Sequence, residues 1–185
     1  TAHIWINGEL VPLHEARISP LDQGFQVGAG VFETLRSYRG HPFALGRHLE
    51  RMTQGAEVFG LVPPDEKVAA QAIDSVLQAN GFADEDARIR ITLTRNENHQ
   101  ETLTISAGEL PNHPKEAAVI TVPFARNENS PLTGIKSTSY AENTIAMKLA
   151  AEKGANEALF PNSKGELCEG ASSNVFLVIN DQLVT

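Results

Sequence analysis

The sequence predicts an α+β fold, because helical and strand patterns alternate and several strands are joined by hairpin turns. Two amphipathic helical patterns cover 45–59 and 65–80, and a strictly alternating strand pattern, ARIRITLTR, follows at 87–95. The 185 residues are 41% hydrophobic, which is enough apolar material for one large domain or two small ones. A globular protein with a substantial hydrophobic core is therefore expected.

Charge and composition exclude several classes of function. Fifteen Lys and Arg stand against 23 Asp and Glu, a formal net charge of −8, and no basic cluster is longer than a pair, which argues against a nucleic-acid surface. No apolar run approaches the ~18 residues that would suggest a membrane span, and the N-terminus does not resemble a signal peptide. The single Cys168 excludes an intramolecular disulfide framework, so a soluble protein of the reducing cytoplasm is expected.

The N-terminal stretch should form a hairpin followed by a glycine-rich approach to a strand. In HIWINGELV the pair Asn7-Gly8 separates two apolar runs, and both positions accept the positive φ that a tight hairpin turn requires. Three glycines then precede an extended run. They do not match a dinucleotide-binding fingerprint, because Glu33 stands where the third glycine is needed, and no Gly-Lys-Ser/Thr follows for a phosphate loop.

The two helical patterns predict which side chains face the core. Gly60 and Gly81 are plausible ends for the helices. The inward residues are expected to be Leu45, Leu49, Met52, Ala56 and Phe59 in the first helix and Val68, Ala72, Ile73, Val76 and Leu77 in the second.

The remainder of the chain predicts two further strands, a linker and the start of a second domain. TLTIS and AAVITVPF are strand patterns, and the polar stretch at 124–134 lacks apolar periodicity. After it come a helix at 142–153, the strands NEALFP and SNVFLVIN, and a hairpin turn at Asp181-Gln182. We therefore expect an N-terminal α+β domain at 1–123, a linker at 124–134 and, at 135–185, the start of a C-terminal domain. The segment 135–185 is small for an independent core, which suggests an incomplete protein.

Two ionisable residues are candidates for catalysis. Lys136 lies in GIKSTSYAEN and Glu169 in ELCEGASSNVFLV. A lysine held on a fixed backbone can form an imine with pyridoxal phosphate, and a carboxylate beside the ring nitrogen keeps that nitrogen protonated. The intervening helix and strand are long enough to leave and return, so that both residues could face one cleft. From spacing alone, a solvated linker lysine and a turn carboxylate remain the alternative.

Three ordered motifs resemble one enzyme family. GIKSTSYAENTIA, GANEALFPNSKGELCEGASSNVFLV and the upstream LDQGFQVGAGVFETLRSYRGHPFALGRHLERM together cover nearly the whole chain. They resemble the class IV, fold-type IV aminotransferase group, which includes branched-chain and D-amino-acid aminotransferases and 4-amino-4-deoxychorismate lyase. The resemblance implies a two-domain fold: a small N-terminal α/β sandwich and a larger C-terminal α/β barrel-like domain, truncated here.

The resemblance also implies a set of residues that bind pyridoxal phosphate. Lys136 is similar to the Schiff-base lysine that shuttles the catalytic proton, and Glu169 to the partner of the pyridinium nitrogen. Arg51 matches the arginine that binds the cofactor phosphate, a role that suits its forked donors. Tyr140 falls near the position of a tyrosine beside the phenolic oxygen of the cofactor. The loop after the glutamate, which faces the phosphate, contains Ser172, Ser173 and Asn174.

On the substrate side, the resemblance implies Phe32, Glu33 and Arg95. Phe32 and Glu33 match residues that line the substrate, and core packing is the alternative for Phe32. Arg95 resembles a strand-end arginine that meets a substrate carboxylate, and an ordinary surface arginine is its alternative.

The expected function is transfer of an amino group between an amino acid and a 2-oxo acid through the Lys136 Schiff base. Aminodeoxychorismate lyase activity, which releases pyruvate and 4-aminobenzoate, is the alternative reaction, and a cofactor-free binding protein on the same fold is the alternative of another class. The resemblance implies a homodimer. A metal site is not expected, because the histidines show no i,i+4 pair and no Cys-x-x-Cys companion.

Overall fold

The computed structural model describes residues 2–185, which form two compact units. Unit 1 comprises the chain up to Pro111 together with Gly134–Ser139, and unit 2 comprises Asn112–Thr133 and Tyr140–Thr185. Each unit has its own cluster of buried hydrophobic side chains. The mixture of helices and largely antiparallel strands confirms the α+β class. None of the helices in the described part of the chain is long and apolar enough to cross a membrane.

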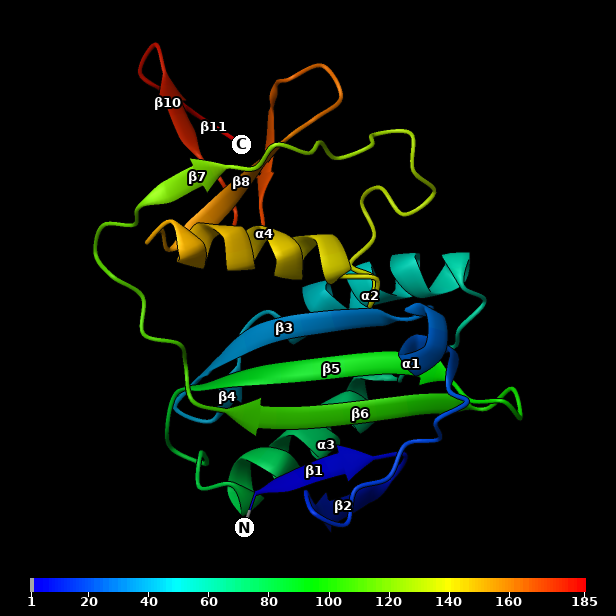
Figure 1. The fold of residues 1–185 in the computed structure, drawn as a ribbon. Helices are drawn as coiled ribbons and strands as arrows, with labels where there is room; N and C mark the ends of the chain where they lie inside the picture. The colour runs from blue at the N-terminus through cyan, green and yellow to red at the C-terminus, as the bar shows by residue number, and fades with distance from the viewer. Residues whose placement is uncertain (1) are drawn as a thin grey trace. The chain divides into compact units, whose positions relative to one another are not determined.

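Unit 1 is built on a six-stranded antiparallel sheet with the strand order β2-β1-β6-β5-β3-β4 (Figure 1). The first hairpin is confirmed, because Asn7 and Gly8 have φ angles of 47° and 104° and the pairing closes at Ile6 and Glu9. The strands are β1 (His3–Ile6), β2 (Glu9–Pro12), β3 (Val31–Tyr38), β4 (His41–Pro42), β5 (Ala87–Arg95) and β6 (Glu101–Gly108).

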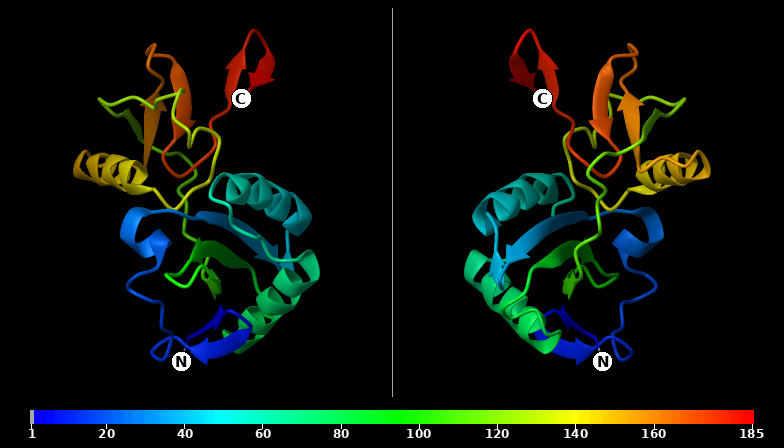
Figure 2. Two further views of the ribbon diagram at one scale, coloured as in Figure 1. Left: turned by 90° about the vertical axis from the view of Figure 1, so that its right-hand side faces the viewer. Right: turned by 90° about the vertical axis from the view of Figure 1, so that its left-hand side faces the viewer.

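Two long helices cover one face of this sheet. They are α2 (Leu45–Val58) and α3 (Glu66–Ala79), and the short helix α1 (Gln23–Val27) lies at the opposite face (Figure 2). Gly60 and Gly81, just past the ends of the two long helices, have φ angles of 64° and 80°, as expected for helix-terminating glycines. Both predicted helices are therefore confirmed, whereas α1 was not anticipated from the glycine-rich stretch.

The buried side chains of the two helices agree with the expected pattern except at one position. Leu49, Met52 and Ala56 are buried in α2, while Leu45 and Phe59 are partly buried against the same cluster. In α3 the inward set contains Ala69, and Val68 is 44% exposed, so the expectation that Val68 faces the core is wrong. Successive helical residues turn by ~100°, which places Val68 well off the centre of the stripe and Ala69 close to it.

Strand alternation divides the side chains of the sheet between two faces. On β5 the buried Ile89, Ile91 and Leu93 pack with the helices, and Arg90 lies on the other face. On β3 the same alternation directs Val31 and Leu35 toward the helices. The face opposite the two long helices therefore carries polar residues of β5, which matters for the site below.

Unit 2 contains a mixed sheet in which β8 pairs in parallel with β7 and antiparallel with β9, together with a separate β10-β11 hairpin. Phe160 and Ala158 form its core with Ala146 and Ala150 of α4. Its elements are β7 (Val119–Thr121), α4 (Ala141–Glu152), β8 (Glu157–Pro161), β9 (Leu167–Gly170), β10 (Leu177–Ile179) and β11 (Gln182–Val184).

The C-terminal hairpin forms one residue earlier than expected. Its turn consists of Asn180 and Asp181, with φ angles of 49° and 61°, and Gln182 already pairs with Ile179. Asn and Asp tolerate the left-handed region better than Gln, which accounts for the shift. Glu169 lies within β9, opposite Phe160 of β8.

The two compact units differ in extent from the segments expected as domains. The segment at 112–123 groups with unit 2, because β7 pairs with β8, and 134–139 groups with unit 1. The division into domains at 1–123 and 135–185 stays a prediction.

Candidate active site

Lys136 is held at the edge of the unit 1 sheet by backbone hydrogen bonds. Its carbonyl accepts the Phe32 N–H at 3.0 Å, and the Thr138 N–H donates to the Gly30 carbonyl at 2.9 Å. Ser137 forms an antiparallel bridge with Val31. The segment 134–139 therefore continues the sheet beside β3, which gives Lys136 the fixed backbone that a covalent catalyst requires.

The neighbouring Ile135 and Ser137 anchor this segment from the helix-covered side. Ile135 packs against the core of unit 1, and Ser137 is buried. Gly55 of α2 permits this approach, because a Cβ at that position would lie 3.1 Å from side-chain atoms of both Ile135 and Val31. Alternation then directs Lys136 to the other face of the sheet.

Two cationic side chains share the ring of Phe32 on that face. The Lys136 Nζ lies 4.6 Å from the ring centroid, and the Arg90 Cζ lies 3.8 Å from it. Phe32 itself is only 3% exposed. A cation over an aromatic face is attracted by the quadrupole of the ring, so both cationic groups are attracted to Phe32. Arg90 was not anticipated as a site residue.

Glu33 points to the opposite face from Phe32 and binds Arg51. Its carboxylate is completely buried and accepts hydrogen bonds from Arg51 Nε and Nη2, both at 2.6 Å. His48 Nδ1 lies 2.7 Å from the same carboxylate. Adjacent strand residues face opposite sides of a sheet, so Phe32 and Glu33 point away from each other, and the expectation that both line the substrate stays a prediction.

The ion pair determines the charge state of Glu33. Burial alone would raise the pKa of this carboxyl group, but the hydrogen bonds and charges of Arg51 and His48 outweigh burial, and the pKa lies below its ordinary value. The same carboxylate raises the pKa of Arg51. Arg51 keeps Nη1 outside the pair, and its side chain is 51% exposed, so it can still bind a second anion.

Arg95 lies away from this cluster. Its guanidinium donates to Glu101 at 2.9 Å and to the Gly60 carbonyl, just beyond the end of α2. It has the same strand parity as Ile91 and Leu93, which face the helices. The structure thus brings Phe32 together with Lys136 and Arg90, and it does not bring Arg95 to them.

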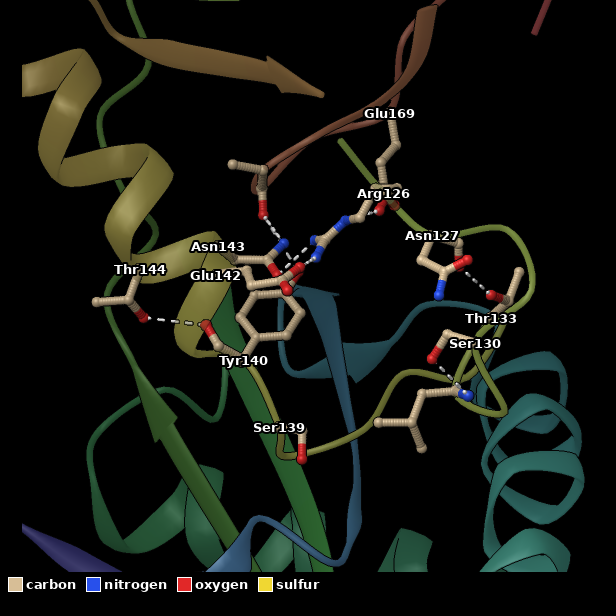
Figure 3. Close-up of polar contacts among 12 residues, drawn as sticks. Arg126, Asn127, Ser130, Thr133, Ser139, Tyr140, Glu142, Asn143, Thr144 and Glu169 are labelled. Atoms are coloured by element: carbon tan, nitrogen blue, oxygen red, sulfur yellow. Dashed lines mark hydrogen bonds and ion pairs between the residues drawn. The ribbon is translucent and has the colours of Figure 1, made fainter. Parts of the chain in front are cut away.

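In unit 2, Glu169 is held by Arg126 (Figure 3). The Arg126 Nε donates to the Glu169 Oε1 at 2.6 Å, and the Glu169 side chain is 50% exposed. Arg126 lies in the stretch expected as a linker and was not singled out. Nothing in its spacing distinguishes it, since its partners are 16 to 43 residues away.

The loop after Glu169 is tied to the start of α4. The Ala171 carbonyl accepts hydrogen bonds from the Tyr140 hydroxyl at 3.2 Å and from Asn143 Nδ2 at 2.7 Å. Tyr140 and the glutamate loop are therefore joined within unit 2, and their roles toward a cofactor stay predictions. The Tyr140 hydroxyl is the donor in this hydrogen bond, and the Ala171 carbonyl is the acceptor.

Glu157 orders the serines of that loop. Its carboxylate, which is 8% exposed, accepts a hydrogen bond from the Ser172 hydroxyl at 2.7 Å. Burial would raise the pKa of Glu157, but bonds from Ser172, Ser173 and the Ala158 N–H outweigh burial and lower the pKa. Ser172, Ser173 and Asn174 are exposed, so they can contact a ligand. Glu157 was not anticipated, because an acidic residue opening an apolar strand carries no motif.

A pocket of about 400 Å³ lies beside the lysine segment in unit 1. It lies on the face that carries Lys136, and α1 and the loop before it form its far wall. Asp22 fixes that wall, because its buried carboxylate accepts hydrogen bonds from the Gly24 N–H and the Thr94 hydroxyl, both at 2.8 Å. The threonines that line it are Thr92, Thr94, Thr102, Thr104 and Thr138.

Comparison with known proteins identifies the family. The family "Amino-transferase class IV" matches residues 30–185. The probable branched-chain-amino-acid aminotransferase of Rickettsia felis is 31% identical over 99% of this chain and 67% of its own length. The aminodeoxychorismate lyase of Bacillus subtilis is 28% identical over 94% of this chain and 63% of its own.

Solved structures agree with the sequence relatives. The branched-chain aminotransferase of Thermoproteus uzoniensis with norvaline has a TM-score of 0.86 and 27% identity, covering 98% of this chain and 67% of that one. The PLP-bound form of a hypothetical aminotransferase from Mycobacterium tuberculosis has a TM-score of 0.82 and 25% identity, covering 96% of this chain and 68% of that one. The chain thus spans about two thirds of the length of these proteins. On the match over 30–185 and the similarity of sequence and structure, this chain belongs to the class IV aminotransferases, pyridoxal-phosphate-dependent enzymes of fold type IV.

Proposed function

We propose that this protein transfers an amino group from an amino acid to a 2-oxo acid and that Lys136 is the residue that binds pyridoxal phosphate covalently. The observation that carries the proposal is the position of Lys136, fixed on the edge of a sheet with its amine over the ring of Phe32, which Arg90 also contacts. Pyridoxal phosphate supplies an electron sink for the bonds at the substrate α-carbon. The chain supplies the groups that bind it and move protons.

The residues present fit this cofactor by their chemistry. The amine of Lys136 suits the aldehyde, and the carboxylate of Glu169 suits the ring nitrogen. Arg51 has the donors for a phosphate, but it pairs with Glu33 on the helix side of the sheet, whereas Lys136 lies with Phe32 on the other side, so its contact with the cofactor rests on the resemblance alone. Tyr140 would donate to the phenolic oxygen only if its single hydroxyl proton turned away from the Ala171 carbonyl. The exposed hydroxyls and backbone N–H groups of the loop that Glu157 orders suit the phosphate side, and they belong to Ser172, Ser173 and Asn174.

Lys136 also serves as the proton carrier. With pyridoxal phosphate bound, the amine of Lys136 would be the group that takes the proton from the substrate α-carbon and delivers it to C4′ of the cofactor. A general base must lie within hydrogen-bond reach of the proton that it removes, and the fixed backbone of Lys136 limits the region that its four-carbon side chain can reach. Phe32 limits the freedom of the amine by holding it over its ring.

Arg90 is the residue that we propose to bind the substrate carboxylate, in place of Arg95. It lies on the same face as Lys136 and is exposed, with its Nε donating to the Thr92 hydroxyl at 3.3 Å, whereas Arg95 lies on the helix side and binds Glu101. A guanidinium presents two parallel N–H groups to a carboxylate, an arrangement that a lysine cannot supply.

Substituting Arg90 tests this role. Arg90→Met is expected to raise KM for the amino acid about tenfold or more with a smaller change in kcat, because a charge-assisted contact made in the ground state is lost. Steady-state kinetics measure the two constants. Arg88→Met, two residues earlier on the same exposed face, is the matched control and should leave both unchanged. A larger rise in KM for Arg95→Met than for Arg90→Met would contradict the assignment.

The proposed reaction is tested by the half-reaction of the full-length protein with single donors. L-Leucine, as expected from relatives named branched-chain aminotransferases, should convert the visible absorption of bound pyridoxal phosphate into the ultraviolet absorption of pyridoxamine phosphate. D-Alanine and L-glutamate are tested in parallel. A yellow protein that no donor bleaches, but that releases pyruvate from aminodeoxychorismate, would favour the lyase reaction of the Bacillus subtilis relative instead. A protein that binds no pyridoxal phosphate would favour the cofactor-free alternative.

The protein is further proposed to act as a homodimer in the cytoplasm. Support for the homodimer comes from a group of exposed apolar side chains in and before α1 of unit 1. Support for the compartment comes from the single, exposed Cys168, a free thiol that suits a reducing environment. The exposed apolar group consists of Ile18, Leu21, Phe25 and Val27.

A further inference from the structure

Arg126 donates three charge-assisted hydrogen bonds to three different side chains of unit 2 (Figure 3). Its Nε binds Glu169, its Nη1 binds Glu142 and its Nη2 binds the Asn143 Oδ1, each at 2.6 Å. The guanidinium is thus used on all three of its nitrogens, and the side chain is 21% exposed. Such a fork of fixed donors is specific to arginine.

Packing and backbone contacts fix Arg126 independently of these bonds. The guanidinium carbon lies 3.9 Å from the ring centroid of Phe160, which is completely buried in the core of unit 2. The Arg126 N–H donates to the Pro161 carbonyl at 2.8 Å, in a parallel bridge to Asn162. The guanidinium is therefore held over a buried ring by contacts other than its three side-chain hydrogen bonds.

Glu169 depends on this arginine for its orientation. Its side chain is 50% exposed, and among the residues that the structure describes Arg126 alone donates a hydrogen bond to its carboxylate. An exposed glutamate without such a partner samples many rotamers, and fixing them costs conformational entropy. The bond to Arg126 engages Oε1 and leaves Oε2 for another donor.

We propose that Arg126 is a positioning residue for Glu169: it holds Oε1 so that Oε2 is presented to the ring nitrogen of pyridoxal phosphate. The inference rests on the proposed function, because it assumes that Glu169 is the partner of that nitrogen. Arg126 itself contacts no reacting atom in this role. Glu142 and Asn143, in the first turn of α4, complete the frame that keeps the guanidinium in place.

The substitution Arg126→Met in the full-length protein tests the role. Methionine keeps an unbranched apolar stem over Phe160 and removes all three donors. We expect kcat to fall about 10- to 100-fold, with a smaller change in KM for the amino acid, as for supporting partners of other cofactor-binding groups. The dissociation constant of pyridoxal phosphate should rise about tenfold, measured by equilibrium dialysis. Lys148→Met, at a 76% exposed position of the same unit, is the matched control and should change neither.

A double-mutant cycle with Glu169→Gln separates positioning from a merely structural role. If Arg126 acts through Glu169, then Arg126→Met should have little further effect on cofactor affinity or kcat in the Glu169→Gln background, because the oriented carboxylate is already gone. The pH dependence of the visible spectrum of the bound cofactor should shift in the same direction in both single variants. Urea unfolding of the cofactor-free variants checks that each one folds.

The outcomes distinguish the inference from the function on which it rests. In one outcome, Glu169→Gln is strongly impaired and the double variant shows the full product of the two single-variant effects on kcat and cofactor affinity. That result would overturn the role of Arg126 and leave the proposed function intact. A Glu169→Gln variant with unchanged cofactor affinity, spectrum and turnover would overturn the assignment of Glu169 and, with it, the inference.

Discussion

Replacing Lys136 by alanine is expected to reduce transaminase turnover by at least about 10³-fold, because the same side chain binds the cofactor and carries the proton. The fold should remain intact. Lys136 contributes to unit 1 through its carbonyl, which accepts the Phe32 N–H, and alanine retains that bond. Stopped assays of amino-group transfer at saturating donor and pyridoxal phosphate measure the loss, and circular dichroism checks the fold.

The control for this variant is another lysine of the same chain. Lys164→Ala changes an exposed turn residue and should leave turnover within about twofold of the original. Multiple turnovers by Lys136→Ala at an undiminished rate would contradict the account of Lys136, whereas slow activity restored by an added primary amine would agree with the loss of a proton carrier.

Replacing Arg51 by methionine is expected to lower the free energy of unfolding of the cofactor-free protein by about 3 kcal/mol or more at pH 7. The reason is that the completely buried Glu33 carboxylate loses both of its 2.6 Å guanidinium bonds and retains only His48. Urea unfolding measures this free energy. Arg47→Met, at an exposed position on the same helix, should change it by no more than about 0.5 kcal/mol.

The loss of unfolding free energy caused by Arg51→Met should become smaller as the pH falls. In the original protein the folded state lowers the pKa of Glu33. The ionised Glu33 therefore stabilises the fold at pH values above the ordinary carboxyl pKa. This stabilisation is lost as the pH falls through the lowered pKa of the folded state. In the variant, burial without the arginine favours the protonated acid, so acid relieves the cost of the buried charge. Both effects make the difference in unfolding free energy between the original protein and Arg51→Met smaller at pH 4 than at pH 7. A difference that is constant over this range would contradict the buried ion pair.

Local patterns predicted the elements of this fold well because local physics determines them. The Asn7-Gly8 hairpin and the helices that end before Gly60 and Gly81 follow from allowed φ angles and 3.6-residue periodicity. The prediction for Val68 was wrong because this apolar residue lies about 100° around the helix from the middle of the buried stripe. Helix α1 was missed because its cap depends on Asp22, whose carboxylate is fixed by Thr94 in a distant strand.

The site was less predictable, because side-chain partners come from distant segments. Strict alternation already separated Phe32 from Glu33, and applying it would have assigned Glu33 to the helix side and Arg90 to the side of Phe32. The partnership of Arg126 with Glu169, 43 residues away, has no local signature. A polar stretch without periodicity resembles a linker whether or not one of its side chains organises a site.

The most direct test of the central claim is to locate the covalent attachment of pyridoxal phosphate. The full-length protein is loaded with the cofactor, reduced with borohydride, digested and analysed by peptide mass spectrometry. The account predicts a pyridoxyl group on Lys136 and on no other lysine, with loss of the label when an amino-acid donor is added before reduction. A label on a different lysine, or none in protein that is active and yellow, would contradict it.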